Sequence, residues 1–259
     1  MTTSQPSQSP TQARGVLADA LVTLAQTPDD KPDIDTRLAR LAQLAADRVA
    51  GVDYASVTAL RGEEYITVAA SSDLAHAVDQ AQYADQAGPC LQSLDTEAPV
   101  TVPEIARTMA WPGFHQAAAE LGLHSSVSIP LAVGSGAIIA VLNLYGRDAV
   151  AMAPLIVGVW AVYDPARPLP DRVDELPPLD AGGEELLAGC AEALSISSTI
   201  QLALGIIMGR THSTAQEAYV KLRLHTAETG TSLLAAANAV VRQGFVDCTS
   251  SDGTPTDIA

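Results

Sequence analysis

The last third of this chain contains an apolar pattern that only a long helix packed against a partner can satisfy. Small and apolar residues recur at alternating steps of four and three: Leu186, Cys190, Ala193, Ser197, Ile200, Leu204 and Ile207. This spacing is typical of the seam of a two-stranded coiled coil. Since such a seam needs a second helix to cover it, we expect the helix from Glu184 to Met208 to form a homodimer.

Two shorter helices are expected directly after the long one. The second helix begins at a capping box, in which Ser213 is followed three residues later by Gln216. Gly230 ends this helix, and Thr231 or Ser232 caps the third. Three helices joined by such tight turns predict one small all-α domain.

The residues of these helices follow a known pattern. It consists of Ile200, Ala203, Gly205, Ile206, Met208 and Arg210, then Glu217, Ala218, Tyr219, Leu222 and Arg223, then Leu233, Ala236, Val240 and Val241. In order and spacing these residues resemble the ANTAR family of transcription antitermination regulators. The resemblance implies a three-helix domain that binds hairpins of a leader transcript.

Four residues are candidates for contact with RNA. Tyr219 and Arg223 lie four residues apart on the second helix and therefore share a face. A phenol beside a guanidinium can stack on unpaired bases and hydrogen-bond to them, and the resemblance implies that this pair contacts RNA. Arg210 and Lys221 are expected to contact phosphates. From the residues alone another interpretation stays open, in which Tyr219 packs half into the core with Arg223 at its rim and the isolated charges are solvated.

Three positions depart from the family pattern, which usually places basic residues there: Thr199, Leu204 and Ser232. We interpret Leu204 as a residue of the dimer seam in place of a charge. Two hypotheses follow. In the first, which we prefer, the chain is a ligand-regulated RNA-binding antiterminator. In the second, its helices have lost RNA affinity and serve as a dimerisation or protein-interaction module.

Charge is distributed unevenly along the chain, whose net charge is −16. Residues 196–243 contain four basic and two acidic residues, whereas residues 1–194 contain ten basic and twenty-five acidic ones. Because an acidic surface is repelled by a nucleic-acid backbone, only the helical domain is suited to dock on RNA. Its positive charge is small, so shape and stacking must contribute much of the affinity. We expect no DNA partner.

The preceding part of the chain predicts an α/β domain with a mostly antiparallel sheet flanked by helices. Strands are expected at 55–60 and 64–70 around Gly62, at 99–102, at 127–133 with strict alternation, and at 137–145. Helices are expected at 36–50, 73–84, 114–121 and 151–162. This order of elements is typical of a sensor domain.

Six spaced motifs make the assignment more specific: Gly88-Pro89-Cys90-Leu91, Val100-Thr101-Val102-Pro103, Trp111-Pro112-Gly113-Phe114, Gly122-Leu123-His124-Ser125-Ser126, Ile129-Pro130-Leu131 and Val141-Leu142-Asn143-Leu144-Tyr145. They resemble the GAF domains of actinobacterial regulators. The resemblance implies a small-molecule effector held between the sheet and its covering helices. We expect a largely apolar ligand and no known cofactor, and the cyclic-nucleotide signature is missing. The expected lining is Tyr83, Cys90, Leu91, Trp111, Phe114, His115, Val127 and Ile129.

Some of these residues also have a purely structural interpretation. Trp111 and Phe114 are large apolar side chains, which most often fill a core. Cys90 follows Gly-Pro at an expected helix start, where the helix dipole favours a thiolate. The alternative for Cys90 is a buried, inert thiol.

A proline-rich stretch separates the two modules. Five prolines between residues 164 and 178 disfavour helix and favour an extended connector. We therefore expect that no unbroken helix transmits a signal between the modules. The expected order is a disordered tail at 1–12, the GAF sensor at 13–163, a linker at 164–183, the coiled-coil helix with the ANTAR domain at 184–244, and a disordered tail at 245–259.

Enzymatic function is not expected. The sequence has no Gly-rich phosphate loop, His-Glu-x-x-His or Gly-x-Ser-x-Gly motif, and its five His form no ligand-spaced cluster. Three widely spaced Cys indicate neither a disulfide framework nor a zinc site, which favours the reducing cytoplasm. The N-terminus lacks the features of a signal peptide and no apolar run reaches about twenty residues, so we expect no membrane partner.

Overall fold

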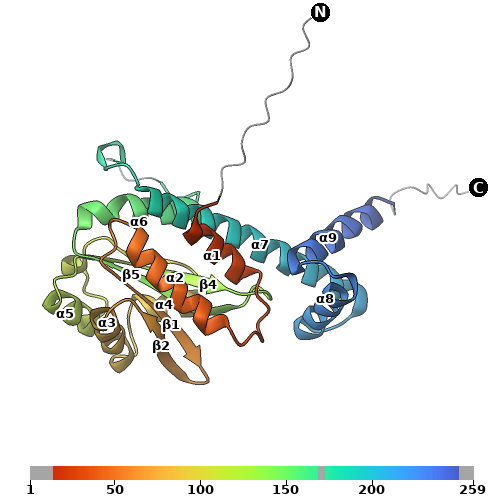
Figure 1. Ribbon diagram of the computed structural model, residues 1–259, viewed down its shortest axis with the longest axis horizontal. Helices are drawn as coiled ribbons and strands as arrows, with labels where there is room; N and C mark the ends of the chain where they lie inside the picture. Colours follow the sequence, from red (N-terminus) through yellow and green to blue (C-terminus); the bar gives the residue numbers. More distant parts are fainter. Residues whose placement is uncertain (1–13, 169–172, 251–259) are drawn as a thin grey trace, which may run out of the picture.

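The computed structural model describes residues 14–168 and 173–250, which form an α/β domain followed by a helical bundle (Figure 1). The α/β domain has one five-stranded sheet of order β2-β1-β5-β4-β3, in which all neighbours pair antiparallel. Its strands are β1 (Tyr54–Arg61), β2 (Glu64–Ala70), β3 (Val100–Val102), β4 (Ser125–Ala132) and β5 (Ile138–Gly146). The expected antiparallel sheet is confirmed.

Helices cover both faces of the sheet. On one face lie α2 (Ile34–Arg48) and α6 (Ala149–Tyr163), and on the other lie α3 (Asp73–Ala84), α4 (Pro89–Thr96) and α5 (Pro112–Glu120). Helix α5 begins two residues earlier than expected, because proline is well tolerated in the first turn of a helix. Two short 3-10 turns, η1 (Ile105–Arg107) and η2 (Val173–Glu175), lie in the connections.

Strict alternation along the strands gives each face its own core. Val57, Ile129 and Leu142 point from three neighbouring strands into the core under α2 and α6, and each is fully buried. Side chains at the intervening positions, such as Ser128 and Asn143, point to the face covered by α3 and α4 and are buried as well. The sheet is therefore buried on both sides at its centre.

Helix α7 (Ala181–Thr211) is continuous over 31 residues and joins the two parts of the chain. Asp180 caps its start by accepting hydrogen bonds from the amides of Gly182 and Gly183, and His212 ends it in a left-handed conformation with φ of 50°. Its first half contributes Leu186 and Cys190 to the core that contains the sheet. As expected, the proline-rich stretch separates α6 from α7, but α7 itself packs in the cores of both parts, so one unbroken helix does link them.

The apolar seam of α7 finds its partner within the same chain. Helix α1 (Val16–Ala25), which the sequence pattern did not predict, packs along α7 (Figure 1). The two helices approach closely at Gly189, where an added methyl group would lie 2.8 Å from the Cα atom of Ala18. The seam therefore no longer requires a second copy, and the reason given for a coiled-coil homodimer is overturned. Among the described residues α7 is also the one helix long and apolar enough to cross a membrane, but it packs here as a core helix.

Helices α8 (Ala215–Thr229) and α9 (Leu233–Ser250) complete the bundle with the second half of α7. The capping box of α8 is Thr214 with Glu217, one residue later than expected: Glu217 accepts from the Thr214 amide at 2.9 Å, and Thr214 accepts from the Glu217 amide at 3.3 Å. The carboxylate of Glu217 is favoured over the side-chain amide of Gln216 in this position, because a negative charge is stabilised at a helix N-terminus. Gly230, with φ of 67°, ends α8, and Ser232 caps α9, as expected.

Helix α9 continues to Ser250, so it enters the tail at 245–259 that was expected to be disordered. The rest of that tail and the tail at 1–12 lie outside the described residues. Of the linker, the described part leads from α6 to the cap of α7 on the surface of the α/β domain.

Candidate functional site

A network of buried polar side chains lies between the sheet and helices α3 and α4. Asp79, from α3, is fully buried and accepts hydrogen bonds from the hydroxyl of Tyr145 at 2.7 Å and that of Thr67 at 2.9 Å. Beside it, Asn143 of β5 donates to the hydroxyl of Thr58 at 2.9 Å. Polar groups that are buried in this way must be paired, so they fix the geometry of the surrounding side chains.

Burial controls the protonation of this network. Removal from water raises the pKa of Asp79 to about 6, although the hydrogen bonds from Tyr145 and Thr67 act in the opposite direction. The buried carboxyl group therefore changes its charge close to neutral pH. A group of this kind can bind a hydrogen-bond donor or acceptor, depending on its protonation state.

Three residues expected to contact a ligand lie next to the network. The Tyr83 hydroxyl is hydrogen-bonded to the hydroxyl of Thr58 at 2.8 Å and to that of Thr67 at 2.9 Å. Cys90 and Leu91 are buried at the start of α4 and pack with Tyr83 against the sheet. Burial raises the pKa of the Cys90 thiol well above its usual range, which supports the interpretation of an inert thiol.

The aromatic pair expected in the same pocket fills a neighbouring core. Trp111 and Phe114 contact each other edge to face, with ring centroids 6.3 Å apart. Phe114 is fully buried and packs near Tyr145, so the structural interpretation of this pair holds in this conformation. His115 follows on α5 and is half-buried.

Val127 and Ile129 do not belong to this site, which corrects the expected lining. Both side chains point to the opposite face of the sheet, into the core under α2. Alternation along β4 predicts that they share a face, but it does not say which helices cover that face. Sequence reasoning missed the polar side chains that are buried between the sheet and helices α3 and α4, which are Ser56, Thr58, Asp79, Gln82, Ser128 and Asn143. Their signal was available, since polar residues alternate with apolar ones in three strands that are otherwise buried.

In the bundle, Tyr219 is not an exposed platform for RNA bases. Its exposed fraction is 4%, and its ring packs in the bundle core with Ala218 and Leu222. The Tyr219 hydroxyl donates a hydrogen bond of 3.0 Å to the carboxylate of Asp29, in the loop between α1 and α2. Burial and the nearby Asp29 raise the pKa of Tyr219 to about 12, so the hydroxyl stays protonated.

Arg223 is held by the same loop. Its guanidinium forms an ion pair of 3.0 Å with Asp30 and lies 5.8 Å from the centre of the Tyr219 ring. Hydrogen bonding to Arg223 lowers the pKa of Asp30, which keeps that carboxylate charged. The expected pair of Tyr219 and Arg223 does share one face of α8, and that face is turned toward the α/β domain.

Arg210 and Lys221 lie elsewhere. Lys221 is exposed and donates to the hydroxyl of Thr211 at 2.8 Å, beside Arg210, which is also exposed. Two residues apart on a helix differ in direction by about 200°, so Lys221 points away from Tyr219. A groove with a volume of about 530 Å³ lies next to Lys221 and the end of α7. The four expected RNA contacts therefore form two separate surfaces.

The three positions that lack the usual basic residues have structural roles or are solvated. Leu204 has an exposed fraction of 7% and packs in the bundle core, so it faces neither RNA nor a second copy of the chain. Ser232 caps α9, and Thr199 is half-buried on α7 with its hydroxyl bonded to the Ser195 carbonyl.

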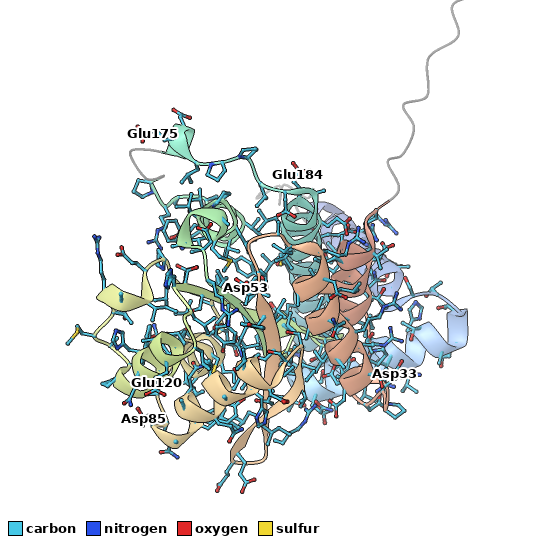
Figure 2. All side chains as sticks on the ribbon, turned by 60° about the vertical axis from the view of Figure 1, so that its left-hand side comes forward. Asp33, Asp53, Asp85, Glu120, Glu175 and Glu184 are labelled. Atoms are coloured by element: carbon cyan, nitrogen blue, oxygen red, sulfur yellow. The ribbon has the colours of Figure 1, made fainter. Side chains whose placement is uncertain are left out.

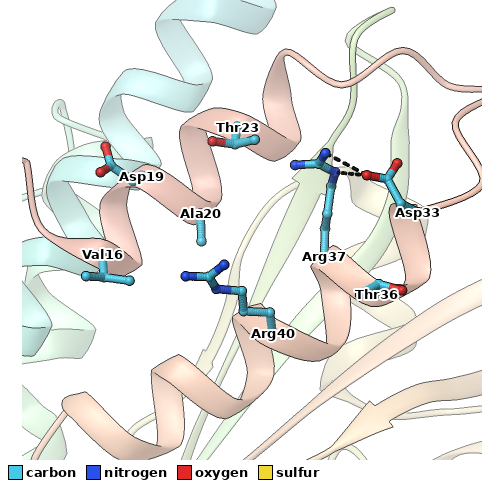
Figure 3. Close-up of a pocket in the computed structure, with 8 residues that line it drawn as sticks. All are labelled: Val16, Asp19, Ala20, Thr23, Asp33, Thr36, Arg37 and Arg40. Carbon is cyan, nitrogen blue, oxygen red and sulfur yellow. Dashed lines mark hydrogen bonds and ion pairs between the residues drawn. The ribbon is translucent and has the colours of Figure 1, made fainter.

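Two further surface features bear on partners. Figure 2 shows acidic side chains toward the edges of the molecule, among them Asp33, Asp85 and Glu120 of the α/β domain. This surface repels nucleic acid. A groove of about 500 Å³ runs between α1 and α2, where Arg37 pairs with Asp33 at 2.6 Å (Figure 3). It lies apart from the buried network under α3 and α4.

Comparison with known proteins identifies both parts of the chain. Residues 32–153 match the family model of the GAF domain, and residues 189–241 match that of the ANTAR domain. No curated protein sequence matches the chain. Two solved structures are similar over part of it. The reduced form of fRMsr of Staphylococcus aureus is 14% identical with a TM-score of 0.39, covering 68% of this chain and 90% of its own. A domain of a sensor histidine kinase protein, described as putative, from Sinorhizobium meliloti 1021 is 12% identical with a TM-score of 0.36, covering 69% and 92%. Values this low say nothing about function.

Proposed function

We propose that this chain, which joins a GAF domain to an ANTAR domain, is a ligand-responsive RNA-binding regulator of transcription antitermination. The GAF domain is the input and the ANTAR domain the output. The partners are a small-molecule effector and hairpins of a leader transcript, in the cytoplasm. Both domains are regulatory, and the protein is not an enzyme.

The observation that carries this proposal is the continuity of α7. Leu186 and Cys190 belong to the core of the sensor, while Ile200 and Ala203 of the same helix belong to the core of the bundle. A packed core has discrete arrangements rather than a continuous range, so a rearrangement in the sensor displaces the output helix. Helix α1 strengthens this coupling, because it contributes to both cores.

The effector site is proposed to lie between the sheet and helices α3 and α4. In this conformation side chains fill the region, since Asp79, Gln82 and Cys90 are fully buried. An effector must therefore displace side chains and take over their hydrogen bonds. Since the lining is polar, we now propose an effector with several hydrogen-bonding groups in place of a largely apolar one.

The output surface is proposed to consist of two parts of the ANTAR domain, with Arg210 and Lys221 in one part and Arg223 and Tyr219, which are bound to Asp30 and Asp29 in this conformation, in the other. Filter binding to a two-hairpin leader RNA tests this, with a duplex of equal length as the competitor at the same salt concentration. Lys221→Ala should weaken binding and reduce the salt slope by about 1. Arg107→Ala removes an equal charge from an exposed position of the GAF domain, where Arg107 pairs with Glu104, and serves as the matched control. Equal affinity of the wild type for both RNAs would contradict the proposal.

A second function is favoured by one specific observation. Val220 and Leu224 lie one turn apart on α8 and are 46% and 57% exposed, which is unusual for neighbouring apolar side chains. Such a pair suits a module that binds another protein or a second copy of this chain, which would form a homodimer. Light scattering of the wild type and of Val220→Ser/Leu224→Ser distinguishes the alternatives. A dimer that dissociates in the variant, combined with no preference for the hairpin RNA, would favour the second function.

A further inference from the structure

Three segments that are far apart in the sequence meet at one point of the molecule: the loop at 26–33, the β4–β5 turn at 133–137, and α8. The Gly134 amide donates to the Thr27 carbonyl at 2.8 Å, and the Ser135 amide donates to the Asp29 carboxylate at 2.9 Å. The same carboxylate oxygen accepts the hydroxyl of Tyr219. Asp29 therefore connects the loop, the turn and the face of α8 that contains Tyr219.

The contact is closely fitted. A methyl group added to Gly134 would lie 2.8 Å from the Thr27 carbonyl oxygen and 2.9 Å from the Tyr219 hydroxyl, so only a residue without a side chain fits there. Gln201 of α7 adds a hydrogen bond of 3.2 Å to the carbonyl of Gly136 in the same turn. The bundle thus docks on the GAF domain through a specific interface.

The chemistry of the interface matches that of RNA. Tyr219 and Arg223, the pair suited to stack on bases and bind phosphate, are bound by the carboxylates of Asp29 and Asp30. A carboxylate offers the same negative charge and the same acceptor oxygens as a phosphate. Two adjacent carboxylates can therefore occupy the groups that an RNA backbone would use.

We propose that the loop at 26–33 is an intramolecular inhibitor, whose carboxylates bind the Tyr219 hydroxyl and the Arg223 guanidinium until the GAF domain releases α8. This inference rests on the proposed RNA-binding function and specifies how the output surface is regulated. The loop connects α1, which packs on α7, with α2, which covers the sheet. A change in the sensor core therefore moves the loop relative to α8.

The contact is weak enough to be reversible. Asp30 and Arg223 remain 63% and 35% exposed in their side chains, and an ion pair in water is easily replaced by another. The Asp29 carboxylate also keeps its hydrogen bond to the β4–β5 turn when α8 leaves, so the loop need not rearrange. Release then requires that the Tyr219 hydroxyl and the Arg223 guanidinium separate from Asp29 and Asp30, while α1 and α7 keep the apolar contacts that hold the bundle core together.

The test compares two pairs of substitutions that remove equal charge. Asp29→Ala/Asp30→Ala removes both carboxylates that hold α8. Asp33→Ala/Asp35→Ala removes two nearby carboxylates whose ion-pair partners, Arg37 and Arg61, lie in the GAF domain. With the two-hairpin RNA, the first pair should bind about tenfold more tightly than the control pair. Equal affinity of the two variants would overturn the inference, because a general loss of negative charge would then explain any gain.

A second readout needs no RNA. Hydrogen–deuterium exchange of the amides at 215–229 should be faster in Asp29→Ala/Asp30→Ala than in the control, with equal melting temperatures of the GAF domain. Equal exchange would overturn the inference whatever the RNA result. If neither variant nor the wild type binds the RNA, the proposed function fails, and the inference that the loop inhibits RNA binding fails with it. Failure of the inference alone is recognised by RNA binding that is the same in all three proteins.

Discussion

The hydroxyl of Tyr219 donates a hydrogen bond of 3.0 Å to the carboxylate of Asp29, a residue that lies 190 positions earlier in the chain. This contact joins α8 of the ANTAR domain to the loop between α1 and α2. The ring of Tyr219 is 4% exposed because it packs in the bundle core, so the hydroxyl is the part of this side chain that reaches Asp29. The stability of the bundle and its availability to a partner are therefore linked at one side chain.

Leu204→Glu should unfold the bundle core and not simply separate a dimer. Leu204 is 7% exposed, and a buried, unpaired carboxylate costs at least about 3 kcal/mol in the free energy of unfolding. Leu202→Glu is the matched control, because Leu202 is 50% exposed on the same helix and should change stability by less than about 0.5 kcal/mol. Thermal unfolding with light scattering checks both. A stable Leu204→Glu monomer derived from a wild-type dimer would restore the coiled-coil interpretation.

Gly189→Val should destabilise the protein by forcing α1 away from α7. The new Cβ atom would lie 2.8 Å from the Cα atom of Ala18, which is backbone and can move only with its helix. Overpacking of this kind costs about 1–3 kcal/mol. Gly205→Ala in the same helix has no atom within 4 Å of the added methyl group and should stabilise by about 0.5–1 kcal/mol. Denaturant titration of both variants measures the contrast, and equal effects would show that α1 does not pack there.

Asp79→Asn should change how stability depends on pH. The pKa of Asp79 is about 6 in the folded protein and near its ordinary value when unfolded, so the folded state holds the proton more tightly. The contribution of protonated Asp79 to the free energy of unfolding is therefore fully present below about pH 4 and is lost as pH rises through about 6. The loss amounts to about 3 kcal/mol. Denaturant titration at pH 4.5 and pH 7 should show Asp79→Asn gaining stability relative to the wild type at the higher pH. A constant difference between the two proteins would contradict the assignment.

Local patterns predicted most of the fold. Alternation of apolar residues located β1, β2, β4 and β5 to within one or two residues, and Ser232 and Gly230 were identified as a cap and a helix end by their residue types. These features depend on neighbours in sequence. Which element covers a surface is decided by segments that are distant in sequence. The seam of α7 required a covering helix, but nothing in its spacing distinguishes a second copy from α1 of the same chain.

The candidate sites were less predictable for the same reason. Val127 and Ile129 were correctly predicted to share a face of the sheet, but that face is the one covered by α2 and not the one expected. Periodicity gives only the relative orientation of side chains. Tyr219 and Arg223 were placed on one face of α8, yet the carboxylates that bind them come from a loop with no local signature. Contacts between distant segments become visible only when the chain is folded.

Affinity for the two-hairpin RNA, measured side by side for Tyr219→Phe and Tyr219→Ala, tests the central proposal most directly. Tyr219→Phe keeps the ring for stacking and removes the hydroxyl that binds Asp29, so this variant should bind more tightly than the wild type. Tyr219→Ala removes the ring, which contributes to the bundle core and could stack on a base only after release, so this variant should bind roughly ten to a hundred times more weakly. Opposite directions for the two variants are the predicted result. Equal affinities of both variants and the wild type would contradict it.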